Sequence, residues 1–375
     1  MMITEPIGLY IHVPFCKSKC NYCDFLSFPC AVSRYEQDYV DALIGEISSY
    51  RQAPKLRVDT VFFGGGTPTL LSEKSFVKIF AAINEAFLLL SNTEITVESN
   101  PKTLNEQKLR ILKELGVNRV SMGLQSVHEN ELRELGRIHS FDDFLSSYEI
   151  CEKLGVTNIN IDLMYGIPHQ TYASFAETLR RVSAFSPKHI SVYGLMLEEG
   201  TPFFAKKDSL VLPSEDEECE MYYLAADFLR GVGYRHYEIS NSAKEGYECR
   251  HNLKYWHDQE YIGLGLAAHS YFGKKRYSNV SSFEEYFSPE MAKYRQETTL
   301  TEADEAYEFA MMRLRLAEGF SLSEYEARFS RSFLFGREDF IQKLQSAELL
   351  SLENGRINLT EKGFYVSNSI LSELL

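Results

Sequence analysis

The sequence has no apolar run of the ~18 residues that a membrane-spanning helix needs. It also lacks a positive balance of charge, since 53 acidic residues outnumber 39 Lys and Arg and give a formal net charge of −14. Nucleic-acid binding depends on Lys and Arg that neutralise phosphates, so this balance argues against a DNA or RNA partner. The N-terminal stretch MMITEPIGLY has an acid and a proline but no basic region, which excludes a secretory signal. We therefore expect a cytoplasmic protein.

A disulfide framework is not expected either. The chain has seven cysteines, an odd number, and a cytoplasmic protein lies in a reducing compartment. Four of the cysteines are scattered and are interpreted as buried apolar side chains or inert thiols: Cys30, Cys151, Cys219 and Cys249. The other three lie within eight residues of each other, which indicates a shared role.

Six short, β-rich apolar runs recur through the first half of the chain. Such near-continuous apolar character is typical of a parallel sheet that is buried on both faces. The runs cover residues 9–13, 60–63, 95–97, 120–124, 158–163 and 189–195. Amphipathic helical patterns fill the intervals, at residues 35–48, 75–89, 104–115, 131–135 with 141–154, and 172–185. Six strand–helix units are too few for a closed eight-fold barrel, so we predict an α/β fold with a partial (β/α)6 TIM-type barrel.

The strand–helix alternation breaks down after about residue 200. The remaining patterns are a strand at 234–239, a helix opened by a capping box at 301–304 and ending before Gly319, helices at 323–329 and 338–350, a hairpin at 350–359 with its turn at Asn354 and Gly355, and a final helix at 360–374. We predict a C-terminal winged-helix-like α+β domain that acts as a lid or packing module, because the acidic chain is a poor DNA reader. The predicted domains are 1–200, 201–295 and 296–375.

Cys16, Cys20 and Cys23 have the spacing of a tight loop that points three thiolates at one centre. A structural zinc site takes four protein ligands, whereas three thiolates leave one iron of a four-iron, four-sulfur cubane without a cysteine. The amino and carboxylate groups of a small molecule can ligate that iron, and electron transfer from the cluster to a sulfonium would break a carbon–sulfur bond. The alternative is zinc, with His12, Asp24 or Cys30 as the fourth ligand.

Polar residues and glycines mark the ends of the predicted strands. The segment GGGTPT at 64–69 follows the second strand, and its amides can point at charged groups of a ligand. Ligands of parallel α/β sheets collect at the carboxyl ends of the strands. Six residues occupy such ends: Cys16, Gly65, Glu98, Gln125, Asp162 and Met196. Each one alone is equally compatible with a satisfied buried polar group, but together they predict a binding site.

The segments 10–25 (YIHVPFC…CDF) and 64–68 (GGGTP) resemble the radical S-adenosylmethionine superfamily. More narrowly, they are similar to the group that contains oxygen-independent coproporphyrinogen III dehydrogenase and the heme chaperones, and the resemblance covers almost the whole chain. It implies that Cys16, Cys20 and Cys23 ligate a [4Fe-4S] cluster. It also implies a binding site for S-adenosylmethionine, formed by Tyr10, Tyr22, Gly65, Gly66, Thr67, Glu98, Gln125, Arg137 and Asp162. Arg137 and Asp162 can alternatively form a structural ion pair.

Three features favour the heme-chaperone branch of this group. The dehydrogenase pattern has a further cysteine where this chain has Phe25, and a longer segment ahead of the triad. The stretch RHNLKYW at 250–256 matches the His-Asn-x-x-Tyr-Trp motif of the heme chaperones. Because imidazole is a common axial ligand of heme iron, the resemblance implies that His251 binds heme. A core histidine among packing aromatics is the other interpretation, and Cys249 is an alternative soft ligand.

The resulting prediction is a heme chaperone that binds a [4Fe-4S] cluster, S-adenosylmethionine and heme. Its partner is a heme-accepting hemoprotein, such as a respiratory one, with a transient contact to a membrane protein. The alternative is the dehydrogenase itself, which decarboxylates propionates of coproporphyrinogen III by radical chemistry. A radical enzyme acting on another substrate, such as a tRNA base, is disfavoured by the acidic charge, and a plain zinc-binding fold is the remaining hypothesis. The pattern assigns no catalytic residue and no oligomeric state.

Overall fold

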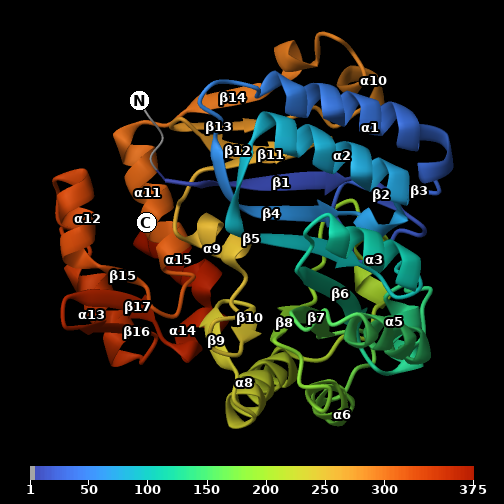
Figure 1. The fold of residues 1–375 in the computed structure, drawn as a ribbon. Coiled ribbons are helices and arrows are strands. Elements are labelled where there is room, and N and C mark those ends of the chain that lie inside the picture. The colour runs from blue at the N-terminus through green and yellow to red at the C-terminus, as the bar shows by residue number, and fades with distance from the viewer. Residues whose placement is uncertain (1–4) are drawn as a thin grey trace.

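The computed structural model describes residues 5–375 and has a central curved sheet of twelve strands (Figure 1). All six predicted strands are present and run parallel to one another in the order of the chain. They are β1 (Ile7–Val13), β4 (Arg57–Gly65), β5 (Leu88–Ser99), β6 (Arg119–Gln125), β7 (Ile159–Tyr165) and β8 (His189–Gly194). The predicted partial barrel is therefore confirmed.

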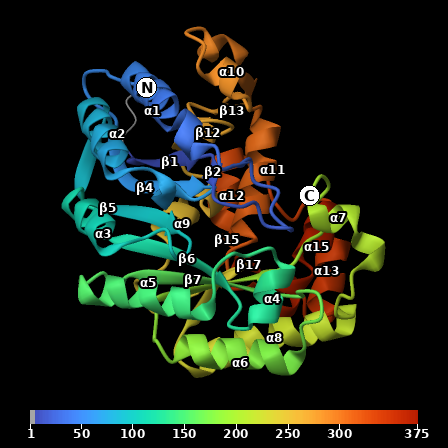
Figure 2. The same ribbon diagram turned by 90° about the vertical axis from the view of Figure 1, so that its right-hand side faces the viewer.

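Helices α1 to α6 connect these strands and follow the outer side of the sheet (Figures 1 and 2). They are α1 (Val32–Ser49), α2 (Glu73–Ala86), α3 (Glu106–Glu114), α4 (Glu129–Glu134), α5 (Phe141–Lys153) and α6 (Tyr172–Ser183). Ser72, Asn105, Ser140 and Thr171 cap α2, α3, α5 and α6, because each side chain accepts a hydrogen bond from a first-turn amide. The apolar stripes of these helices pack on the buried outer face of the strands.

The strand β5 is much longer than the predicted 95–97. It begins at Leu88, so residues assigned to the end of the preceding helix lie in the strand instead. The run FLLL at 87–90 reads equally well as a helix end or as a strand, and periodicity does not separate the two. The helix ends at Phe87, which has extended backbone geometry, and the strand begins where the Leu88 amide donates a hydrogen bond to the Leu56 carbonyl ahead of β4.

A seventh parallel strand, β11 (Tyr261–Leu264), lies beside β1 and was not predicted. It has only four residues and contains a glycine, so its sequence gives little indication of a strand. It forms by pairing with β1, which lies about 250 residues earlier in the chain. Three antiparallel strands extend the sheet beyond it: β12 (His269–Phe272), β13 (Lys275–Ser278) and β14 (Gln296–Thr299). At the other edge, β10 (Asn241–Ala243) and β9 (Arg235–Glu238) follow β8, and β9 confirms the strand predicted at 234–239.

Short elements complete this part of the chain. A two-stranded sheet carries the first cysteine and consists of β2 (Phe15–Cys16) and β3 (Phe28–Pro29). The helices are α7 (Pro202–Ala205), α8 (Glu215–Gly231), α9 (Arg250–Trp256) and α10 (Phe283–Tyr286), with 3-10 turns at Pro68–Leu70, Lys207–Ser209 and Met291–Tyr294. None of the helices within residues 5–375 combines the length and the apolar character that crossing a bilayer requires.

The C-terminal residues form the predicted winged-helix-like unit, drawn in orange to red in Figure 1. Its elements are α11 (Glu302–Arg313), β15 (Phe320–Ser321), α12 (Leu322–Phe329), α13 (Glu338–Ser346), β16 (Leu350–Glu353), β17 (Arg356–Leu359), α14 (Glu361–Tyr365) and α15 (Ser367–Leu374). The hairpin turns at Asn354 and Gly355, both with positive φ, as predicted. The single final helix predicted at 360–374 is wrong, because the chain leaves helical geometry at Val366.

The hydrophobic core of the C-terminal unit extends to Tyr222 of α8 and packs against Tyr165 of β7, and polar contacts add to this attachment. Glu238 at the end of β9 pairs with Leu316, and the buried carboxylate of Asp258 accepts a hydrogen bond from Arg328 at 2.7 Å. The domain boundaries at 200 and 295 remain predictions. Strand β14, which follows the second boundary, is hydrogen-bonded to the main sheet.

Candidate functional site

A cavity of about 560 Å³ opens on the inner side of the parallel strands and at their carboxyl ends. Its volume falls in the range of ~300–1,000 Å³ that is usual for ligand-binding pockets. Twelve of the thirteen residues predicted to bind a cofactor or cluster line it: Tyr10, Cys16, Cys20, Tyr22, Cys23, Gly65, Gly66, Glu98, Gln125, Arg137, Asp162 and His251. Thr67 lines a smaller neighbouring pocket instead. The structure thus gathers residues from six strands, three loops and the helix α9, while their individual roles remain predictions.

The cysteine loop is held at both ends. Strand β2 ends at Cys16, and the amide of Cys30 donates a hydrogen bond to the Cys16 carbonyl at 2.9 Å. The two ends of the loop between them are therefore held together. In its middle, Asn21 donates its amide to Leu135 at 2.9 Å and its side chain to Glu134 at 2.7 Å. These contacts fix the three thiols over the cavity rather than in solvent.

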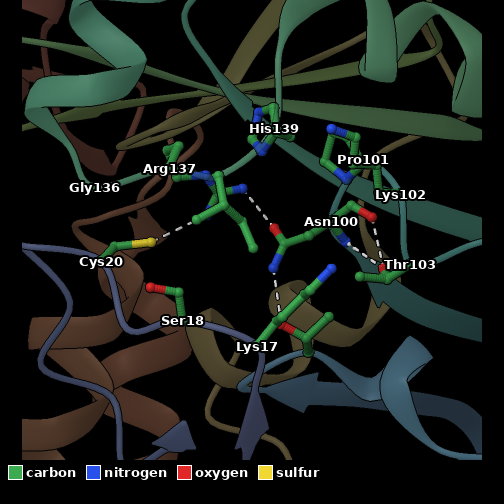
Figure 3. A pocket seen from close by; sticks show the side chains of 12 residues that line it. Lys17, Ser18, Cys20, Asn100, Pro101, Lys102, Thr103, Gly136, Arg137 and His139 are labelled. Carbon is green, nitrogen blue, oxygen red and sulfur yellow. Dashed lines mark hydrogen bonds between the residues drawn. The ribbon is translucent and has the colours of Figure 1, made fainter. Parts of the chain in front are cut away.

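Two polar side chains contact the thiols. The guanidinium of Arg137 donates to the Cys20 sulfur at 3.4 Å, and the hydroxyl of Thr67 donates to the Cys16 sulfur at 3.8 Å (Figure 3 shows the first of these). Arg137 also donates to Asn100, whose amide in turn donates to Thr67 at 2.8 Å. Hydrogen bonds from Arg137 and Thr67 therefore connect two of the three cysteines to the residues that surround the loop.

The zinc alternative finds no support in this arrangement. No three His, Cys, Asp or Glu side chains within residues 5–375 are grouped as ligands of one metal ion. Both ring nitrogens of His12 are engaged, one with Tyr10 at 3.1 Å and one with the Leu26 carbonyl at 2.9 Å. The Cys30 thiol is exposed and donates to the Lys17 carbonyl. A cubane takes each thiolate on a different iron, so its ligands stand further apart than those of one ion.

The glycines after β4 allow close packing of the chain against the cysteine segment. A Cβ at Gly66 would lie 2.5 Å from the Phe15 carbonyl oxygen, and one at Gly65 would lie 2.5 Å from the His12 ring. Gly65 also has a φ of +105°, which other residues rarely adopt. The sequence predicts that these glycines let a ligand approach the backbone. In the structure the freed space is occupied by the protein itself, which brings the glycine turn and Cys16 together.

Two partly buried carboxyl groups, those of Glu98 and Asp162, face the cavity. Burial, reinforced by the neighbouring charge of Asp162, raises the pKa of Glu98 to about 8, while Glu98 accepts a hydrogen bond from the Gly65 amide. Burial also raises the pKa of Asp162, although Asn160 and Ser121 donate hydrogen bonds to it. The ion pair of Asp162 with Arg137, considered from the sequence, is not among the ion pairs of residues 5–375. Arg137 bonds to Cys20, Asn100 and the Gly123 carbonyl instead.

His251 lies on the floor of the cavity in the first turn of α9. It is 1% exposed, stacks on Phe62 at a centroid distance of 5.3 Å, and engages Thr60 at 2.9 Å and Tyr255 at 2.8 Å through its two nitrogens. Glu94 of β5 accepts from the His251 amide at 3.2 Å and fixes the start of the helix. Trp256 of the same motif and Cys249, which directly precedes the motif, do not line the cavity.

Sequence reasoning missed several lining residues. Arg119 and Ser121 of β6 point to the inner face, and the apolar residues between them point to the outer face. Inward positions on β4 and β8 are occupied by Phe62, His189 and Tyr193. The alternation of polar side chains along residues 119–125 was the available signal, since strand residues two apart share a face. Phe25 and Met196 stand at the rim and are 63% and 61% exposed.

Known families match this chain over most of its length. The model of the Radical SAM superfamily matches residues 10–182, and that of the HemN C-terminal domain matches residues 300–366. The chain is 34% identical to "Heme chaperone HemW" of Lactococcus lactis over all of this chain and 98% of that protein. It is also 34% identical to "Heme chaperone HemW" of Bacillus subtilis over 98% of both chains.

A solved structure has the same fold. Coproporphyrinogen III oxidase (HemN) from Escherichia coli, described as a Radical SAM enzyme, superposes with a TM-score of 0.86 at 24% identity and covers 98% of this chain and 90% of its own. The chain therefore belongs to the radical S-adenosylmethionine superfamily, whose members hold a [4Fe-4S] cluster and S-adenosylmethionine, and within it to the HemW family.

Proposed function

We propose that this protein is a cytoplasmic heme chaperone, which binds heme in the cavity and transfers it to an acceptor hemoprotein. The observation that carries the proposal is the convergence of the three thiols and His251 on one cavity. The names of the two curated relatives described above, both heme chaperones, support the same activity. Phe25 stands at the rim, where the dehydrogenase pattern has a cysteine, so we do not extend the proposal to that enzyme.

Each group of residues has a part in this proposal. Cys16, Cys20 and Cys23 hold the cluster. The residues that fit S-adenosylmethionine are Tyr10, Tyr22, Gly65, Gly66, Thr67, Glu98, Gln125, Arg137 and Asp162. Two of them have buried polar atoms without a partner among residues 5–375, the side-chain oxygen of Gln125 and the Nε of Arg137, which suits contact with a polar ligand. When bound, the cluster and S-adenosylmethionine supply one-electron cleavage of a carbon–sulfur bond.

His251 is prepared to ligate iron in its neutral form. Burial, followed by the nearby charge of Lys254, lowers the pKa of His251 to about 3, so the ring is uncharged at physiological pH. Neutral imidazole is the form that binds metals. With Nδ1 bonded to Thr60, the other nitrogen faces Tyr255, whose hydroxyl must move aside before iron can bind. Tyr255 is thus proposed to compete with heme for His251.

Replacement of His251 by Ala is expected to abolish the heme spectrum of an axial histidine and to weaken heme binding about tenfold or more, because an iron–nitrogen bond is lost. Replacement of Tyr255 by Phe removes the competing hydroxyl and is expected to preserve or tighten binding. Heme titration followed in the Soret region measures both. Equal affinity and equal spectra for wild type and His251→Ala would refute the assignment of His251.

Binding of S-adenosylmethionine is expected to tighten as the pH rises toward 8. In the free protein Glu98, with its pKa raised to about 8, is mostly protonated at neutral pH. A cationic sulfonium amino acid near it favours the carboxylate, so binding releases a proton and the affinity increases by up to about tenfold per pH unit below 8. Calorimetry at pH 6.5, 7.5 and 8.5 measures the slope, with Glu98→Gln as the pH-independent control. An unchanged slope in that variant would place the proton elsewhere.

A further inference from the structure

Arg119 is a fully buried cation on the cavity floor. It is 2% exposed and lines the cavity from the inner face of β6. Within residues 5–375 the Nε of Arg119 is buried without a hydrogen-bond partner, and Arg119 takes part in none of the ion pairs. Thr96, which faces Arg119 in the β5–β6 register, has a buried hydroxyl that is also unpartnered.

The acidic groups nearest to Arg119 are engaged elsewhere. Glu94 accepts hydrogen bonds from the amides of Arg250 and His251, at 3.3 and 3.2 Å. Asp162 accepts from Asn160 at 2.7 Å and from Ser121 at 3.3 Å. Both carboxylates attract Arg119 through space, but neither approaches within ion-pair distance. The Cys249 thiol and the Tyr237 hydroxyl, which also face it, form their bonds with Glu94 and His189.

A buried charge without a hydrogen-bonded partner is strongly unfavourable, and Arg does not lose its charge in proteins. Its planar fork of N–H groups matches a carboxylate bidentately. His251 and Arg119 line the same cavity, and the charge of Arg119 is near enough to contribute to the lowered pKa of His251. A ligand coordinated by His251 would therefore bring its periphery toward Arg119. We propose that Arg119 binds a propionate carboxylate of the tetrapyrrole that His251 coordinates in this cavity. This inference rests on the proposed heme-binding function.

The test compares ligands and variants in the reconstituted holoprotein. Wild type is expected to bind heme about tenfold or more tightly than heme dimethyl ester, which has the same ring and iron but no carboxylate. Arg119→Gln is expected to weaken heme binding by a similar factor, to leave binding of the dimethyl ester unchanged, and to leave the affinity for S-adenosylmethionine within about twofold. Arg119→Lys keeps the charge without the fork and should lie between. Arg235→Gln, at an exposed arginine of β9, is the matched control.

The outcomes separate this inference from the function beneath it. If wild type binds heme but does not distinguish it from the dimethyl ester, Arg119 contacts only water and the inference is wrong, even if Arg119→Gln fails to fold. If Arg119→Gln weakens S-adenosylmethionine instead of heme, the carboxylate belongs to that ligand and the inference is also wrong. If wild type binds neither tetrapyrrole, the proposed function itself fails.

Discussion

Cys20→Ala is expected to lower the iron and sulfide of the anaerobically purified protein from about four atoms of each per chain to near zero. The reason is geometric as well as chemical. Three thiols line one cavity, and Cys20 receives the only hydrogen bond from a guanidinium among them, that of Arg137 at 3.4 Å. A cubane held by three protein ligands has no spare cysteine to replace one that is lost. S-adenosylmethionine binding should disappear with the cluster.

The matched control for this experiment is Cys30→Ala. Cys30 follows the same loop and its amide bonds to Cys16, but its thiol is exposed and points to the Lys17 carbonyl rather than to the cavity. Its removal should leave iron and sulfide unchanged. If both variants lose iron equally, the three-cysteine assignment is wrong, and if metal analysis finds zinc instead of iron, the zinc alternative returns.

The sequence predicts those parts of the site that local pattern determines. Short segments contain both the three cysteines, Cys16, Cys20 and Cys23, and each of the six apolar runs. Once a run is recognised as a strand, the residue that follows it is placed at the edge of the sheet where the cavity opens. The strand β11 and the partners of His251 do not have this property. Thr60 and His251 are 191 residues apart, and their hydrogen bond exists only because α9 packs against β4. Tertiary pairing of this kind leaves no local trace.

Arg119 shows a different limit of prediction. Arg119 lies just before the strand predicted at 120–124, so the sequence does not show that its side chain points inward, is buried and lines the cavity. The sequence also does not show whether an acidic residue neutralises Arg119. Glu94 lies in the neighbouring strand β5, but it accepts a hydrogen bond from the His251 amide of α9. The electrostatic character of the cavity floor therefore emerges only from the assembled sheet.

Gly66→Ala is expected to destabilise the protein by about 3 kcal/mol and to remove both cluster and S-adenosylmethionine binding. The new Cβ would lie 2.5 Å from the Phe15 carbonyl oxygen and 3.0 Å from the Phe15 nitrogen, and backbone atoms cannot move aside as a flexible side chain can. Because Phe15 precedes Cys16 in β2, any relaxation displaces the first thiol.

Gly45→Ala in α1 is the control, since a Cβ there meets nothing within 4 Å and an exposed helical alanine should stabilise by ~0.5–1 kcal/mol. Urea unfolding of the two variants measures the opposite signs. A Gly66→Ala protein with wild-type stability and full iron would show that the glycine turn does not position the cysteine loop, and that its role lies in ligand contact after all.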